Sequence, residues 1–236
     1  MFSIPQRYHQ GSPIEPKTFI QRDMKKAEKD RIRENLLDVR LMWQIAGEEI
    51  PSLINEQYNC SVIMGLDIKL KAIKDAAYFA DLVHRMVKAP CVVRFYDTGS
   101  EVYSFAYKRL SRNDATQIVV ESRVETPELS LSFPDKTTEK LHRYLTFDAL
   151  KNKTDKLCLY LEATVKAFII SNLKLYSGID ELLERKLWYN RDEVLTVFMQ
   201  LLELERLNNE LRAEKLPGER AKLMGEIRVT IRDIKQ

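Results

Sequence analysis

Asp67 and Lys69 are the residues whose types and spacing come closest to a catalytic arrangement in this sequence. They lie in and directly after the segment 60–68, which is short, rich in β-branched residues and therefore typical of a strand. Because alternate side chains of a strand share one face, we expect the carboxylate and the ammonium group side by side. A carboxylate that holds a divalent metal ion, beside a lysine that activates water, is the chemistry of a nuclease.

Such a metal site needs a second carboxylate, and no preceding strand supplies one convincingly. The acidic residues between 48 and 56 lie in a Pro-containing stretch that indicates a loop. The order of acid, lysine, helix and further strand is similar to that of restriction-endonuclease cores, so a metal-dependent nuclease using Asp67 and Lys69 is the alternative interpretation. The favoured interpretation is a solvated strand end.

The other reactive residue types form no recognisable catalytic set. His84 follows Asp81 at a spacing that predicts a surface hydrogen bond, and His9 and His142 have no evident partner. The three cysteines lack a C-x-x-C spacing, so we expect buried free thiols. Neither a Gly-rich phosphate loop nor a G-x-S-x-G motif is present. We therefore expect no cofactor, no metal and no catalytic role.

Three aromatic residues, Tyr103, Phe105 and Tyr107, alternate along one predicted strand and so share a face. Beside Lys108 and Arg109 they could stack exposed bases, as in proteins that bind single strands. We favour the interpretation that these rings form a core under the neighbouring Ala-rich helix.

The charge of the chain is weak evidence for nucleic-acid binding. The net charge is +3, from 38 basic and 35 acidic residues that are interleaved along the whole sequence. Arg228 and Arg232, near the end of the chain, are the remaining candidate contacts. Solvated helix faces are the favoured interpretation for such residues.

The pattern of elements predicts an α+β fold with a small β-sheet and packed helices. The segment 59–123 indicates one strand, an amphipathic helix from Lys71 to Lys88 and three further strands. A helix is predicted from Met24 to Ala46, with Trp43 anchored against the sheet, and another from Asp155 to Leu173. We have no interpretation for residues 134–155.

Three regions are expected along the chain: an N-terminal arm at 1–24, an α+β core at 25–180 and a coiled-coil-like helical hairpin at 181–236. Pro217-Gly218 is the predicted turn of the hairpin. We expect its apolar stripe to carry protein association, through Leu201, Leu204, Leu211, Ile227, Ile231 and Ile234.

No run of about 18 apolar residues is present, and Pro5 and Arg7 interrupt the place of a signal peptide. We therefore expect a cytoplasmic protein without membrane association.

Several short motifs together resemble a known family. They are Met42-Trp43-Gln44-Ile45-Ala46, Ile50-Pro51-Ser52-Leu53-Ile54-Asn55, Lys88-Ala89-Pro90-Cys91-Val92-Val93 and Phe105-Ala106-Tyr107-Lys108. With the charged terminal hairpin, they are similar to the bacterial and archaeal domain-of-unknown-function family numbered 4391. The resemblance implies no established activity. It also implies a gene near helicases and DNA methyltransferases in restriction-like or antiphage islands, and hence an accessory role.

Taken together, these patterns favour a non-catalytic accessory subunit that acts with a helicase or a DNA methyltransferase. The alternatives are the metal-dependent nuclease and a module that binds nucleic acid directly. Self-association is a further alternative to a larger protein partner.

Overall fold

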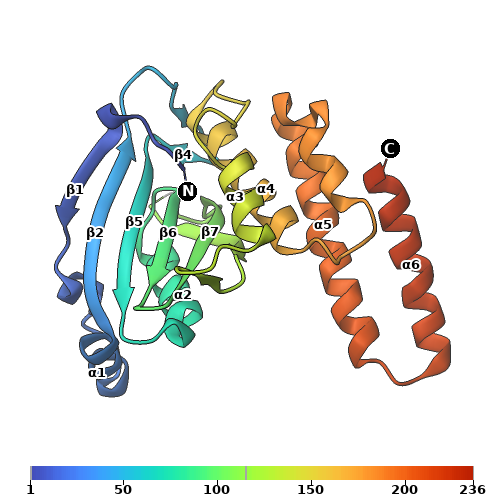
Figure 1. Ribbon diagram of the computed structural model, residues 1–236, viewed down its shortest axis with the longest axis horizontal. Helices are drawn as coiled ribbons and strands as arrows, with labels where there is room; N and C mark the ends of the chain where they lie inside the picture. Colours follow the sequence, from blue (N-terminus) through green and yellow to red (C-terminus); the bar gives the residue numbers. More distant parts are fainter. Residues whose placement is uncertain (1, 115, 236) are drawn as a thin grey trace. The chain divides into compact units, whose positions relative to one another are not determined.

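The computed structural model describes residues 2–114 and 116–235, and the chain divides into two compact units (Figure 1). The first unit extends to Ser171 and the second begins at Asn172. Among the described residues, no helix combines the length and the apolar content that a membrane crossing requires.

The first unit is built on a mixed sheet of seven strands, which confirms the expected α+β class. The strand order is β1-β2-β5-β6-β7-β8, β9 pairs with β7, and only β5 and β6 are parallel. The strands of this sheet are β1 (His9–Pro13), β2 (Leu36–Ile45), β5 (Ile63–Leu70), β6 (Cys91–Tyr96), β7 (Ser100–Leu110), β8 (Ile118–Glu125) and β9 (Leu129–Ser130). A separate two-stranded sheet joins β3 (Leu53–Ile54) to β4 (Asn59–Cys60).

The parallel pair β5 and β6 is connected by α2 (Ala76–Met86), as the sequence predicts for this segment. Ala76, Phe79, Ala80 and Val83 recur at helical spacing and are all buried. They pack on one face of the sheet, in a cluster that includes Ile68, Phe95 and Val102.

The opposite face of the sheet carries the three aromatic residues of β7, all of them buried. The helix that packs on these three rings is not the one that the sequence predicts. Phe105 contacts Tyr160 of α4 (Lys156–Ser171), whereas its neighbour Ser104 is hydrogen-bonded to His84 of α2. Since successive side chains of a strand point to opposite faces, the aromatic row lies under α4 and not under the Ala-rich helix. The shorter α3 (Lys136–Tyr144) precedes α4.

The helix predicted from Met24 to Ala46 is wrong in its second half. α1 spans Lys26–Asn35, and the chain continues as strand β2. After Leu36 polar and apolar residues alternate, with Val39 fully buried and its neighbour Arg40 exposed. An alternation of two residues is the pattern of a strand with one buried face. Pairing with β5 satisfies the backbone hydrogen bonds of this segment and buries that face, so a strand forms in place of the predicted helix. Trp43 therefore lies on a strand and is only partly buried.

The second unit contains the hairpin of α5 (Arg191–Ala213) and α6 (Pro217–Lys235). The side chain of Asn190 caps α5 by accepting hydrogen bonds from the amides of Asp192 and Glu193. Pro217 begins α6 instead of forming the turn, because its fixed φ suits the first position of a helix. Arg185 donates to the carbonyl oxygens of Ile234 and Lys235, and so closes the end of α6.

Candidate functional site

A cavity of about 540 Å³ opens on the face of the sheet opposite α2. Its floor is formed by residues of β2, β5, β6 and β7, and its rim includes Phe2, His9, Leu131 and His142. Cavities that bind small molecules usually measure about 300 to 1,000 Å³. The size is therefore suitable for a ligand of moderate size.

Strand register places two rows of functional side chains across this face of the sheet, and Asp67, Arg94, Tyr103 and Glu101 of these rows line the cavity. One row runs through Arg40, Asp67, Arg94 and Tyr103, and the next through Asp38, Lys69, Tyr96 and Glu101. Directly opposite residues in neighbouring strands point to the same face. The register thus brings together side chains of four strands that lie up to 65 positions apart in the sequence.

Arg94 is the centre of the charged part of the floor. Its Nη1 donates to Oδ2 of Asp67 over 2.9 Å, and its Nε donates to Oε2 of Glu101 over 2.6 Å. The guanidinium also lies over the ring of Tyr96, 4.6 Å from the ring centroid. Both carboxylates are largely buried, so this ion-pair network is shielded from water more than a surface pair is.

The protonation of the network follows from its environment. Burial raises the pKa of Asp67, although the charge and the hydrogen bond of Arg94 oppose the shift. Burial alone would lower the pKa of Arg94, but the hydrogen bonds and charges of Glu101 and Asp67 outweigh it and the pKa is raised. The guanidinium therefore stays charged.

Trp43 forms an aromatic wall of the cavity. Its indole lies against Gly65 of β5 so closely that a Cβ atom at Gly65 would be 1.9 Å from Cε2 of the ring. Phe2 contacts the same indole, with ring centroids 6.1 Å apart. The absence of a side chain at residue 65 is thus what allows the indole to lie flat on the sheet.

The structure changes the account of Asp67 and Lys69. Asp67 is not a solvated strand end, because it is largely buried and paired with Arg94. Acidic residues that sequence reasoning missed are Asp38, which is opposite Lys69 in the register, and Glu101. Recognising β2 as a strand would have revealed Asp38. Within the described ranges, no cluster of three or more His, Cys, Asp or Glu side chains could hold a metal ion.

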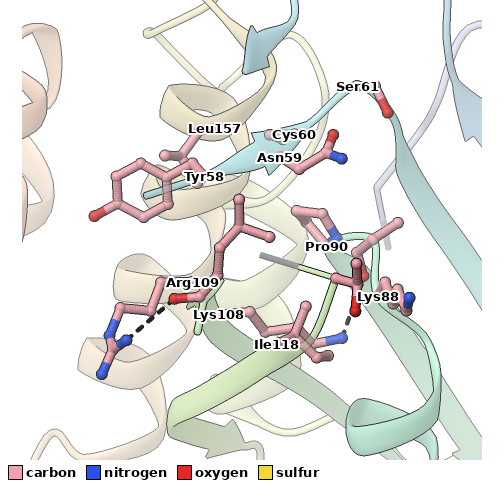
Figure 2. Close-up of a pocket in the computed structure, with 13 residues that line it drawn as sticks. Tyr58, Asn59, Cys60, Ser61, Lys88, Pro90, Lys108, Arg109, Ile118 and Leu157 are labelled. Carbon is pink, nitrogen blue, oxygen red and sulfur yellow. Dashed lines mark hydrogen bonds between the residues drawn. The ribbon is translucent and has the colours of Figure 1, made fainter. Parts of the chain in front are cut away.

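A second cavity, of about 450 Å³, is lined by two of the residues predicted to contact nucleic acid, Lys108 and Arg109 (Figure 2). They are turned inward. Nζ of Lys108 donates to the carbonyl oxygens of Val87 and Ala89, and Arg109 donates to that of Leu110 and pairs with Glu121. The hydroxyl groups of Tyr107 and Tyr58 are 2.5 Å apart.

The favoured core interpretation of the aromatic row agrees with this placement. Tyr103, Tyr107 and Lys108 are buried and Arg109 is half-buried, whereas Arg228 and Arg232 lie on the exposed side of α6.

His84 is buried and is not bonded to Asp81 on the surface, contrary to the expectation. Its Nε2 lies 3.0 Å from Oγ of Ser104, and its Nδ1 lies 3.5 Å from Sγ of Cys91. Asp81 pairs instead with Arg85 and Arg123. The surface prediction failed because His84 falls on the side of α2 that faces the sheet.

This buried cluster is not arranged for nucleophilic catalysis. Burial holds the pKa of His84 well below its usual range and raises the pKa of the Cys91 thiol. A neutral thiol is a poor nucleophile, and Cys91 has no exposed surface. All three cysteines are buried and free, as expected from their spacing.

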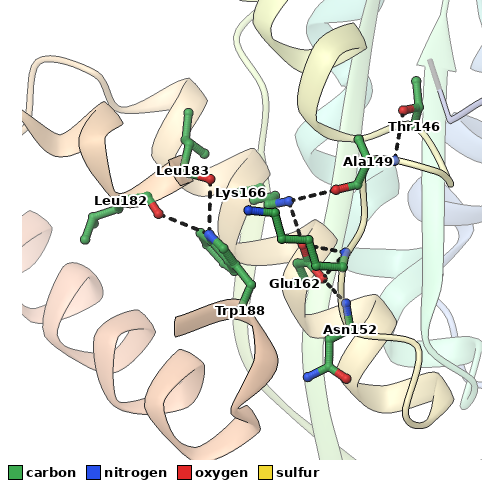
Figure 3. A network of polar contacts seen from close by, with 9 residues as sticks. Thr146, Ala149, Asn152, Glu162, Lys166, Leu182, Leu183 and Trp188 are labelled. Atoms are coloured by element: carbon green, nitrogen blue, oxygen red, sulfur yellow. Dashed lines mark hydrogen bonds and ion pairs between the residues drawn. The ribbon is translucent and has the colours of Figure 1, made fainter. Parts of the chain in front are cut away.

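A buried ion pair organises the loop before α4 (Figure 3). Nζ of Lys166 lies 2.5 Å from Oε1 of Glu162, and both side chains are 1% exposed. Glu162 also accepts hydrogen bonds from the amides of Lys151 and Asn152, and Lys166 donates to the carbonyl oxygen of Ala149. The carboxylate and the ammonium group are therefore both bound by partners within the chain, which indicates a structural role.

A family model described as "Domain of unknown function (DUF4391)" matches residues 2–233. The chain belongs to this family. No curated protein and no solved structure matches it. The resemblance seen in the sequence motifs is thereby confirmed over nearly the whole DUF4391 chain.

The residues predicted to carry association fall into two groups in this DUF4391 protein. Leu201, Leu204 and Ile234 are buried within the chain. Leu211 on α5 and Ile227 and Ile231 on α6 are half-buried. Only the second group has surface to offer to another molecule.

Proposed function

We propose that this protein is a cytoplasmic, non-catalytic accessory subunit that binds a helicase or a DNA methyltransferase in a restriction-like or antiphage defence system. The observation that supports it best is the incomplete burial of α6. Among the described residues of this helix Ile234 alone is buried, while Met224 and Val229 are 44% and 48% exposed. Exposed apolar side chains on a helix that is already paired favour a protein contact.

The charged residues of α6 also favour a protein contact at this helix. Arg228 and Arg232 flank the half-buried Ile227 and Ile231, and Glu226 lies one position before Ile227. Such charged positions beside an apolar stripe set the register and the orientation of a partner helix. The class of the partner comes from the gene surroundings that membership of the family implies.

Affinity purification from the native host, followed by identification of the recovered proteins, tests the proposal. The wild-type chain is expected to recover a helicase or a DNA methyltransferase. Met224→Glu combined with Val229→Glu is expected to reduce that recovery at least about tenfold, since each change places a charge on an exposed apolar position of α6. Leu37→Glu is the matched control, because Leu37 is equally exposed but lies on β2. Recovery of neither enzyme, or equal recovery by both variants, would contradict the proposal.

A metal-dependent nuclease is the second candidate, and one observation favours it. Asp38 lies opposite Lys69 on the strand next to Asp67, so the face holds more carboxylates than the sequence indicated. Against it, Asp38 is paired with Arg40 and Asp67 with Arg94, and a metal ion would have to displace these cations. Cleavage of DNA in the presence of Mg²⁺ or Mn²⁺, abolished in folded Asp67→Ala, would favour this candidate over the accessory subunit.

A further inference from the structure

Arg94 has more hydrogen-bond donors than its protein partners use. A guanidinium group carries five N–H donors in a planar fork. Nε is used by Glu101 and Nη1 by Asp67, and no acceptor for Nη2 is found in the part of the chain that the structure describes. Because Arg94 lines the cavity and keeps 28% of its side-chain surface exposed, these donors are available to a ligand.

The carboxylates beside Arg94 have remaining capacity as acceptors. Asp67 and Glu101 each accept one hydrogen bond from the guanidinium, and a carboxylate can accept about four. Across the floor the order of groups is therefore acceptor, donor, acceptor. Within this row two carboxylates flank one guanidinium, an arrangement that disfavours a bare phosphate or sulfate at the row itself.

Trp43 adds a planar surface to this polar row. Gly65 lies against the indole, and the same indole lines the cavity. Indole faces bind other planar π-systems, nucleobases included, by stacking. Planar stacking beside an alternating donor and acceptor row suits a flat heterocycle with polar edges.

We infer that this cavity binds the base of a nucleotide, stacked on Trp43 and read at its polar edge by Asp67, Arg94 and Glu101. A base has donors and acceptors in one plane, so it can satisfy the carboxylates and the guanidinium together, which neither an anion nor an ammonium group does. The cavity, at about 540 Å³, has room for the base and its sugar.

The phosphate of the nucleotide lies outside the cavity, toward the cations of the same sheet face. Arg40 is opposite Asp67 on β2, and Lys69 follows two positions later on β5. Arg40 is paired with Asp38, and for the ammonium group of Lys69 the described chain provides no ion-pair partner. The ligand comes either from the free nucleotide pool or from a strand in which one base is unstacked.

Fluorescence and dialysis with the full chain test this inference. Trp43 and Trp188 are the two tryptophans, and Trp188 is fully buried, so quenching by a ligand reports on Trp43. The probes are AMP, GMP, CMP and UMP, ribose 5-phosphate as a ligand without a base, and a short single-stranded oligonucleotide. Saturable quenching is expected with at least one of the base-containing probes and not with ribose 5-phosphate.

Variants then locate the binding, measured by equilibrium dialysis. Trp43→Leu keeps an apolar contact with Gly65 but removes the stacking surface, and should weaken binding about tenfold. Arg94→Lys keeps the charge but removes the planar fork, and should have a similar effect. Arg85→Lys is the matched control on the opposite side of the sheet and should bind as the wild type does.

Each outcome decides the inference. Binding of the oligonucleotide much more tightly than of any mononucleotide identifies a strand as the source, and equal affinity identifies the free nucleotide. Absence of binding, or binding that folded Trp43→Leu retains, overturns the inference. If Arg94→Lys does not fold by circular dichroism, Trp43→Leu decides alone. The result is independent of the accessory role, which is tested by recovery of a protein partner with substitutions in α6.

Discussion

The hydroxyl group of Tyr160 on α4 accepts a hydrogen bond from the amide of Ala106 on β7, over 2.8 Å. The same oxygen lies 2.9 Å from the carbonyl oxygen of Cys91 on β6, to which it can donate. One buried side chain thus serves backbone groups of two neighbouring strands at the point where their own ladder has ended.

Tyr160→Phe should therefore lower the free energy of unfolding by about 1 to 3 kcal/mol, because it leaves buried backbone groups without partners. Urea denaturation measures the change. Tyr189→Phe removes the same atom from an exposed tyrosine and should stay within about 0.5 kcal/mol of the wild type. Equal effects of the two substitutions would show that the Tyr160 hydroxyl is not a buried bridge.

The contact between Trp43 and Gly65 predicts a coupled pair of substitutions. Gly65→Ala should destabilise the protein by about 1 to 3 kcal/mol, because the new methyl group occupies the position of the indole. In the Trp43→Ala background the same change should cost much less. A double-mutant cycle by thermal denaturation gives the coupling. Additive effects of the two substitutions would contradict the packing described.

The buried ion pair of Glu162 and Lys166 should be sensitive to the loss of one partner. Lys166→Met is expected to destabilise the fold by about 3 to 5 kcal/mol, because the carboxylate of Glu162 then stays buried without its cation. Glu162→Gln combined with Lys166→Met should cost less than Lys166→Met alone. The control is Arg206→Met, which breaks exposed pairs with Glu203 and Glu210 and should cost much less than Lys166→Met.

His84 makes stability dependent on pH. Its pKa is lowered in the folded chain by burial, so below about pH 6.5 the unfolded chain binds a proton that the folded chain does not. Stability should therefore fall as the pH is lowered, by at most about 1.4 kcal/mol per pH unit from this group. The positive charges of Lys108 and Arg123 act in the same direction.

Unfolding of the wild type and of His84→Gln at pH 7.5 and 5.5 measures this contribution. The variant should be less stable at both values but should lose less between them. An identical loss in the two proteins would mean that folding does not change the pKa of His84.

The local sequence pattern predicts most of the helices and strands, but not which of them pair or pack together. The helical spacing in the segments that form α2, α4 and α5 survives in the structure because each of these helices buries apolar side chains, and that in the segment of α6 survives because α6 pairs with α5. β2 was mistaken for a helix because Ile32, Leu36 and Val39 also fit a helical stripe. Pairing with the edge of β5 provides a ladder of backbone hydrogen bonds, and this favours the strand over the helix.

The local sequence pattern could not predict the candidate site either, because the site depends on which strands pair. The sequence by itself determined the family, the α+β class, the terminal hairpin and the absence of familiar catalytic motifs, since these depend on residues close together in the chain. Only the tertiary structure placed Trp43, Asp67, Arg94 and Glu101 around one cavity, because strand register, and not sequence distance, sets which side chains meet.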